Sequence, residues 1–406
     1  EYYAFELGEV LFVVLDNVVY PCGPDSADAK HDFCGDPDRP TYNGRITATQ
    51  MSWLAGLLET VPMERKIVIA THIPLVSFVD SRSPKHQTDN TGELHALVEG
   101  RPALSLSGHT HTIENHAPGQ VFEGWPESAG VEALPFRHII AGAGSGAWFA
   151  GDFTIDGNPM TLQRMGAPSG VLLLDFDGTE VREQYRGSRI DPERRQWLAL
   201  STPSFRDWFT AIMDWREQDR DSRHPIPPYS INDLPDTGLL TLDDLVGGTW
   251  LAVNVWAGSS ETRVAATLER NDGTRLDLQL ERTQSGSGEA PKIGAEWADP
   301  FAAQRQLSVG RYALISRRGE GRSQGFEQFK GSRRGPEPPR PQGAVADRNM
   351  HLWRARLPDD LAPGVYIAEV TSTDRHGESS TDRMLFEVRA ERPPRYFRTD
   401  VWYGTE

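Results

Sequence analysis

Two short apolar runs that end in histidine, KIVIATH at residues 66–72 and ALSLSGHTH at residues 103–111, decide the fold expected here. Each run has the length and the aliphatic content of a buried strand. Between them, residues 93–98 have the pattern of a short helix. This alternation of strands and helices is typical of a layered α/β domain with parallel strands.

Three histidines stand where these two strands end, and they are the candidate metal ligands. His72 follows the first strand, and His109 and His111 follow the second. Ligand sites of parallel sheets gather outside the carboxyl ends of the strands, and neutral imidazole is a common ligand of zinc, iron and manganese. We therefore expect the three side chains to share one site, with Gly108 permitting the bend between strand and loop.

The remaining sequence divides into an α/β part and a β part. Further strands are predicted at 10–16, 136–141 and 171–176, the last followed by a turn at Asp177-Gly178, and a helix at 46–59 has Thr47 as its cap. An amphipathic helix at 205–216 precedes a proline-rich linker near 220–245. Seven strands separated by polar turns then predict an immunoglobulin-like β-sandwich; they are expected at 250–256, 262–269, 274–280, 311–315, 351–356, 364–371 and 383–388.

Composition limits the classes of partner. The 406 residues include 42 basic and 58 acidic side chains, a net charge of −16, which disfavours binding to nucleic acid. No apolar run approaches the roughly 20 residues of a membrane helix. The sequence starts at Glu1, directly in a predicted strand, so we expect a segment upstream of it.

Cys22 and Cys34 lie in a loop rich in proline, glycine and aspartate. A disulfide between them is expected, with two free thiols as the alternative. Because disulfides persist mainly in oxidising compartments, the pair favours a periplasmic or secreted protein.

Several of these segments resemble the calcineurin-like metallophosphoesterases. The resemblance is carried by YYAFELGEVLFVVLDN at 2–17, QMSWL at 50–54, THIPL at 71–75 and SGHTHT at 107–112, in the order of that family. A narrower similarity, to bacterial members with a C-terminal domain of their own, is carried by four further segments. These are AGAGSGAWFAGD at 141–152, MGAPSGVLLLDFDGTEV at 165–181, VNVWAG at 253–258 and LWRARLPDDLAPGVYIAEVTSTDRHGE at 352–378.

The resemblance implies a division of the chain into four parts. Residues 1–200 would form the C-terminal half of an α/β phosphoesterase sandwich, and residues 201–245 a helix and linker. Residues 246–395 would form the β-sandwich, and 396–406 a tail.

The resemblance also implies a pair of divalent ions, such as manganese, iron or zinc, that activate water for attack on phosphorus. By motif, His72 and His109 would bind one ion and His111 the other. The family's earlier motifs, which carry its bridging aspartate, have no match in this sequence. Two close dications need a bridging anion to offset their repulsion, so we expect the isolated chain to be inactive. The chain is then either a fragment whose N-terminal half lies upstream or a degenerate homologue.

Two functions remain open from the sequence. The first is a metal-dependent phosphomonoesterase or phosphodiesterase acting on a small-molecule or envelope-derived phosphoester, with Trp148 as a candidate lining of its pocket. The second is a non-catalytic module that binds envelope or glycan material through Trp250, Trp256 and Trp353. The basic segment 317–340 is either a solvated loop or an anion-attracting patch.

Overall fold

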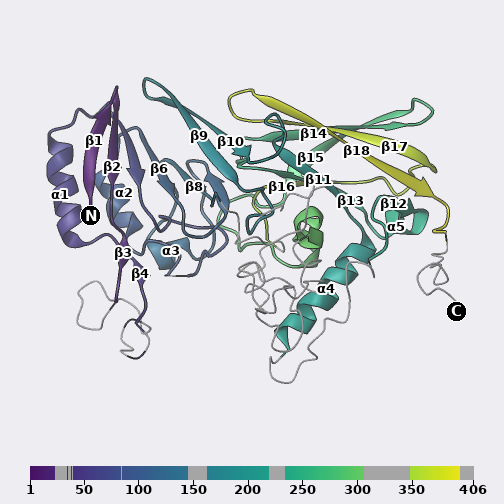
Figure 1. Cartoon of the computed structure of the whole chain (residues 1–406), viewed down its shortest axis with the longest axis horizontal. Helices are drawn as coiled ribbons and strands as arrows, with labels where there is room; N and C mark the ends of the chain where they lie inside the picture. Colours follow the sequence, from purple (N-terminus) through teal and green to yellow (C-terminus); the bar gives the residue numbers. More distant parts are fainter. Residues whose placement is uncertain are drawn as a thin grey trace, which may run out of the picture.

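The computed structural model describes residues 1–22, 34, 38, 40–83, 85–144, 162–218, 234–305 and 348–393. Figure 1 shows two regions along an elongated molecule, a six-stranded sheet with helices at one end and a long-stranded β region at the other. Mixed sheets with few helices therefore make up the fold, as the alternation of short apolar runs predicts for the first region.

The six-stranded sheet has the order β1-β2-β5-β6-β8-β7. Strands β2, β5, β6 and β8 run parallel to their neighbours within this group, and β1 and β7 are antiparallel edge strands. Their bounds are Tyr3–Leu7 for β1, Val10–Val14 for β2, Lys66–Ala70 for β5, Ala103–Ser107 for β6, Ile113–His116 for β7 and Arg137–Ala141 for β8. The strands predicted at 10–16, 66–71, 103–107 and 136–141 are thus confirmed, with ends that differ by up to two residues.

Both faces of this sheet are covered. One face packs against helices α1 (Ala48–Glu59) and α2 (Thr91–Leu97), in a core that includes Leu54, Ile69 and Leu94. The other face packs against the hairpin of β9 (Gly170–Asp177) and β10 (Glu180–Gly187). Thr47 caps α1 by accepting a hydrogen bond from the Gln50 backbone, as its position predicted. Short elements complete the region, namely β3 (Val18–Val19), β4 (Asn43–Gly44) and α3 (Trp125–Ala129).

The C-terminal region contains an eight-stranded sheet with the order β11-β13-β16-β15-β14-β17-β18-β12. Its strands are β11 (Gln196–Ser201), β12 (Leu239–Thr241), β13 (Trp250–Val255), β14 (Arg263–Arg270), β15 (Arg275–Arg282), β16 (Leu352–Arg356), β17 (Gly364–Thr373) and β18 (Ser379–Arg389). Side chains from both ends of this order, such as Leu200 of β11 and Leu240 of β12, share one buried core. Helices α4 (Pro203–Glu217) and α5 (Leu242–Val246) and the short 3-10 helix η2 (Ala295–Trp297) accompany the sheet.

This sheet begins upstream of residue 246, where the β-sandwich was expected to start. Strand β11 pairs with β13 from Gln196↔Val255 to Ser201↔Trp250, and β12 pairs with β18. The strand predicted at 311–315 and the basic segment 317–340 lie outside the described residues. Among the residues that are described, no helix has the length and apolar character needed to cross a membrane.

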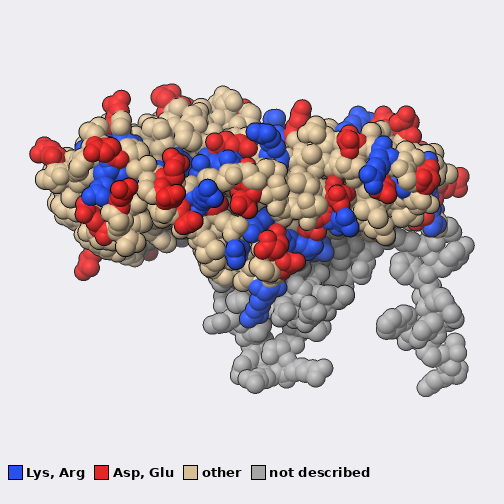
Figure 2. Space-filling model, turned by 90° about the horizontal axis from the view of Figure 1, so that it is seen from above, with Lys and Arg blue, Asp and Glu red and all other residues tan. Residues whose placement is uncertain are grey.

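An ionic cluster joins the hairpin β9-β10 to the C-terminal sheet. Glu183 of β10 accepts hydrogen bonds from Arg375, at 2.7 Å, and lies 3.1 Å from His376, both in the turn between β17 and β18. Burial by itself raises the pKa of Glu183. Arg375, Arg137 and His376 outweigh burial and bring that pKa down to about 2. Elsewhere on the surface, Figure 2 shows acidic and basic side chains interspersed rather than gathered by sign.

We predict that Glu183→Gln lowers the free energy of unfolding by about 3 kcal/mol at pH 7, because the pKa of Glu183 lies well below its ordinary value. The carboxylate stabilises the folded chain fully above its unfolded pKa of about 4.5. This stabilisation is lost as the pH falls from there toward 2. Denaturant unfolding of wild type and variant between pH 7 and pH 3 measures both effects.

Glu369→Gln is the matched control, because Glu369 forms an exposed pair with Arg383 on the sheet surface. An exposed pair contributes at most about 1 kcal/mol. Equal effects of the two substitutions at pH 7 would contradict a special role for the Glu183 cluster.

Candidate metal centre

The register of two parallel strands brings the first two candidate ligands together. Strands β5 and β6 pair from Ile67↔Ala103 to Ala70↔Leu106, so both strands end at the same level. Just beyond them, the Gly108 backbone N–H donates to the carbonyl of His72 at 3.1 Å. The imidazoles then meet, with His109 Nδ1 3.1 Å from His72 Nε2. The sequence predicts that histidines at the strand ends converge, and the structure brings His72 and His109 together there.

Asn17, which follows β2, fixes the backbone at His72. Its side-chain oxygen accepts hydrogen bonds from the N–H groups of His72 and Ile73, at 3.2 and 3.1 Å. Its side-chain nitrogen donates to the carbonyl of Ile73 and to the hydroxyl of Thr88, both at 2.7 Å. Asn17 is fully buried and uses both ends of its amide. The turn that carries His72 is therefore held at the end of the sheet before any ligand binds.

The loop after β6 turns at its histidines rather than at Gly108. His109 and His111 have φ values of 69° and 55°, in the left-handed region, whereas Gly108 does not have a positive φ. The sequence placed the bend at Gly108, because glycine adopts such conformations at the lowest cost. Left-handed backbone at a non-glycine residue costs about 1–3 kcal/mol and is concentrated at functional sites. Two such residues in one three-residue loop make it a candidate for such a site.

His109 is surrounded by rings. Tyr42 places its hydroxyl 3.2 Å from His109 Nε2, and the His86 ring lies 5.3 Å from the His109 ring, centroid to centroid. Burial, followed by the charges of His72, His86 and His111, lowers the pKa of His109 to about 4. His109 is thus neutral at pH 7, which is the form of imidazole that binds a metal. Sequence analysis had found no role for His86.

Arg164 holds the third histidine and an acidic neighbour. Its backbone N–H donates to the carbonyl of His111 at 3.1 Å, and its guanidinium donates to the carbonyl of Thr110 and to Asp80, each at 3.0 Å. Asp80 also lies 3.1 Å from His86 Nδ1. Burial alone would raise the pKa of Asp80, but the hydrogen bond from His86 and the charge of Arg164 keep it well below its usual range. Asp80 therefore stays ionised beside the histidines.

The C-terminal region in turn holds the loop that carries Arg164. The carbonyl of Met165 accepts hydrogen bonds from the side chains of Asn254 and Asn349, both at 2.8 Å. The carbonyl of Gly166 accepts one from the Trp197 indole at 3.0 Å. Gly166 has a φ of 86°, and a Cβ there would come within 2.4 Å of the Ala302 Cβ, so only glycine fits. Contacts with the second region thus position Arg164, and through it the loop at 109–111.

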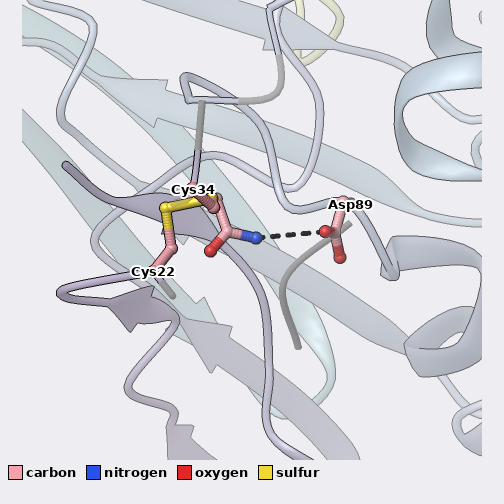
Figure 3. The surroundings of a disulfide bond; sticks show 4 residues. Cys22, Cys34 and Asp89 are labelled. Atoms are coloured by element: carbon pink, nitrogen blue, oxygen red, sulfur yellow. Dashed lines mark hydrogen bonds between the residues drawn. A yellow bond between two sulfur atoms is a disulfide. The ribbon is translucent and has the colours of Figure 1, made fainter. Parts of the chain in front are cut away.

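A disulfide lies on the segment that supplies Tyr42. The sulfur atoms of Cys22 and Cys34 are bonded (Figure 3). The Cys22 N–H donates to the carbonyl of Thr41 at 2.9 Å. Nearby, Asn43 donates to Asp89 at 3.2 Å, the contact dashed in Figure 3. The hydrogen bond from Cys22 to Thr41 and the contact of Asn43 with Asp89 hold the neighbours of Tyr42 on both sides.

Part of the chain is similar to a known protein family. Residues 138–316 match the family model described as "C terminal of Calcineurin-like phosphoesterase". Over these residues the chain is similar to the calcineurin-like phosphoesterases. The matched residues include Arg164, Glu183 and part of the narrower resemblance noted in the sequence. His72, His109 and His111 precede the first matched residue. A search of curated proteins found no match.

Members of the calcineurin-like phosphoesterase family use divalent metals, so we tested whether these residues fit such ions. Within the ranges that the structure describes, no three His, Cys, Asp or Glu side chains are arranged to hold a metal. His72 and His109 do fit as a pair, because two nitrogen ligands of one zinc ion lie about 3–3.5 Å apart. A bridging carboxylate is missing from the pair, and Asp80 is held by Arg164 and His86. The described residues fit the histidine part of a one-ion site and not a complete two-ion site.

Two further candidate residues were named from the sequence, His111 and Trp148. His111 lies near enough for its charge to lower the pKa of His109, but its ring is not in the His72–His109 contact. Trp148 lies outside the described residues. The site also contains four residues that sequence analysis did not assign to it: Asn17, Tyr42, Asp80 and Arg164. Asn17 ends the segment 2–17 but had no role assigned to it, and Asp80 follows the THIPL segment closely without a motif of its own. Tyr42 and Arg164 lie farther along the chain from the histidine motifs.

We predict that the chain binds about one Zn²⁺ through His72 and His109, in the micromolar range or tighter. His109→Ala should weaken this binding at least about ten-fold, because it removes one of two preformed ligands. Isothermal titration calorimetry with ZnCl₂ at pH 7.5 measures both values. His376→Gln is the control, since His376 belongs to the Glu183 cluster. Identical isotherms for wild type and His109→Ala would exclude this pair as the binding site.

Proposed function

We propose that this chain supplies the histidine part of a two-ion site in a metal-dependent phosphoester hydrolase, which acts on a phosphomonoester or phosphodiester. One observation carries the proposal: His72 and His109 meet at the carboxyl ends of adjacent parallel strands, 3.1 Å apart. The similarity of residues 138–316 to the C-terminal part of calcineurin-like phosphoesterases supports the reaction class.

The chain's own residues have separate roles in this proposal. His72 and His109 would hold one ion and His111 the other. When bound, the two ions would supply a water of lowered pKa and charge neutralisation for attack on phosphorus. Tyr42 orients His109 through the contact at its Nε2 atom, and Arg164 fixes the loop that carries His111. Mutual repulsion of two dications requires a bridging anion, which we place in a segment upstream of this chain.

An open sheet edge supports such an upstream segment. Strand β1 is the outer strand of the six-stranded sheet, and its residues Tyr3, Phe5 and Leu7 are 53, 46 and 68% exposed. These three side chains alternate along the strand, so they lie on one face. An exposed apolar row on an edge strand is a surface on which further polypeptide packs or pairs.

The alternative function, a non-catalytic glycan- or envelope-binding module, is disfavoured by its own candidate residues. Trp256 and Trp353 are only 3 and 2% exposed and pack within the cores of the C-terminal region. Trp250 is covered by the guanidinium of Arg354, 4.1 Å from the ring centroid. Sugar rings stack on exposed indoles, so these three do not form a glycan platform.

Two finer features complete the proposal. The common core of strands from both ends of the eight-stranded sheet supports an immunoglobulin-like sandwich for the C-terminal region. The disulfide supports folding in an oxidising compartment, and hence a periplasmic or secreted protein.

We predict that the protein with its upstream segment binds about two metal ions and hydrolyses aryl phosphate esters. The 406-residue chain alone should bind fewer ions and show no turnover, because the bridging anion is missing. Metal analysis of the purified proteins, with assays on 4-nitrophenyl phosphate and bis(4-nitrophenyl) phosphate in Mn²⁺, measures both properties.

His109→Ala in the longer protein should abolish turnover, while His376→Gln should leave it unchanged. A longer protein that binds metal but hydrolyses neither ester would contradict the proposed reaction. Equal activity of both lengths would contradict the split site.

A further inference from the structure

A groove lies between the loop after β5 and a segment of the C-terminal region. It has a volume of about 530 Å³, in the range of about 300–1,000 Å³ that is typical of small-molecule sites. The loop at 79–83 and Glu123 form one wall. Ala290, Pro291, Ile293 and Arg348, from the C-terminal region, form the other.

The groove adjoins the histidine cluster at Asp80. Asp80 lines the groove and its carboxylate lies 3.1 Å from His86 Nδ1. The His86 ring in turn lies 5.3 Å from the ring of His109. The groove and His109 are therefore separated only by the contacting side chains of Asp80 and His86, near enough for one extended ligand to reach both.

The C-terminal wall is held in place by backbone hydrogen bonds to the first region. Gly288 donates to the carbonyl of Val121 at 2.9 Å, and Val121 donates to that of Gly286 at 3.0 Å. Glu123 donates to the carbonyl of Glu289 at 3.1 Å, and the Glu289 carboxylate accepts from the N–H groups of Gly286 and Ser287, both at 2.7 Å. The wall is thus formed before a ligand binds, which lowers the entropy cost of binding.

The chemistry of the two walls differs. On the C-terminal wall Ile293 is 52% exposed, next to Ala290 and Pro291, so an apolar surface faces the groove. The opposite wall carries the exposed guanidinium of Arg82, paired with Glu123, and the hydroxyl-bearing residues Ser81 and Ser83. An alkyl chain fits the first wall, and hydroxyl groups fit the second, where Asp80 and Glu123 can accept hydrogen bonds.

We propose that this groove binds the alcohol portion of an amphiphilic phosphoester, with an alkyl chain against Ile293. This inference rests on the proposed function for the position of the phosphoryl group, and it adds the class of substrate. The C-terminal region is then a determinant of specificity, since it supplies the apolar wall.

Octylphosphonate and methylphosphonate test the proposal, because both carry the same head group and neither is hydrolysed. We expect octylphosphonate to bind the 406-residue chain at least about ten-fold more tightly without metal, which corresponds to burial of about two methylene groups. Ile293→Ser should remove most of this difference. Ile367→Ser is the matched control, because Ile367 is 45% exposed on β17, away from the groove. Calorimetric titration measures each affinity.

The outcomes of these titrations distinguish a failure of the groove proposal from a failure of the proposed function. Equal affinities for the two phosphonates, no binding of either, or equal effects of Ile293→Ser and Ile367→Ser would overturn the groove. A second titration with Mn²⁺ and the longer protein tests the metal site. Octylphosphonate can bind more tightly than methylphosphonate without any gain from Mn²⁺. That outcome would support the groove proposal and count against the proposed function.

Discussion

The alignment of the carboxyl ends of β5 and β6 is the constraint on which the candidate site depends. Parallel pairing sets both strand ends at one level, and the hydrogen bond from Gly108 to the carbonyl of His72 ties the loops that follow. Asn17 adds a buried clamp at His72. With these bonds in place, the histidines meet, and the loop has left-handed backbone at His109 and His111. Backbone strain of this kind persists only where the surrounding structure is rigid.

The second region of the chain contributes to that rigidity. Its side chains hold the carbonyls of Met165 and Gly166, next to Arg164, and Arg164 holds the loop of His109 to His111. The same region supplies one wall of the groove beside Asp80. The β-rich C-terminal region therefore contributes to the candidate site at the end of the six-stranded sheet. It buttresses the histidine loop and shapes the space around it.

Much of the fold could be predicted from sequence because strand periodicity is local. The β6 strand at 103–107 and the cap of α1 at Thr47 follow from residue pattern alone. Strands β11 and β12 were not predicted, because β11 has no clear alternation and β12 has only three residues, paired with the distant β18.

The candidate site divides in the same way. His72 and His109 could be found because they end apolar runs, whereas His86, Asp80 and Arg164 join them only through tertiary contacts. The sequence predicts the bend at Gly108, because glycine adopts left-handed backbone at the lowest cost. In the structure the left-handed residues are His109 and His111. The hydrogen bonds of the loop outweigh the preference for glycine there.

The most direct measurement of the central claim is X-ray absorption at the zinc edge of the Zn²⁺-loaded chain. The convergence of His72 and His109 predicts a first shell that includes two imidazole nitrogens at about 2.0–2.1 Å, with their characteristic outer-shell scattering. His109→Ala should reduce that scattering by about half, because one of the two rings is lost. A first shell of oxygen atoms without imidazole scattering would contradict the claim that these strand-end histidines form a metal site.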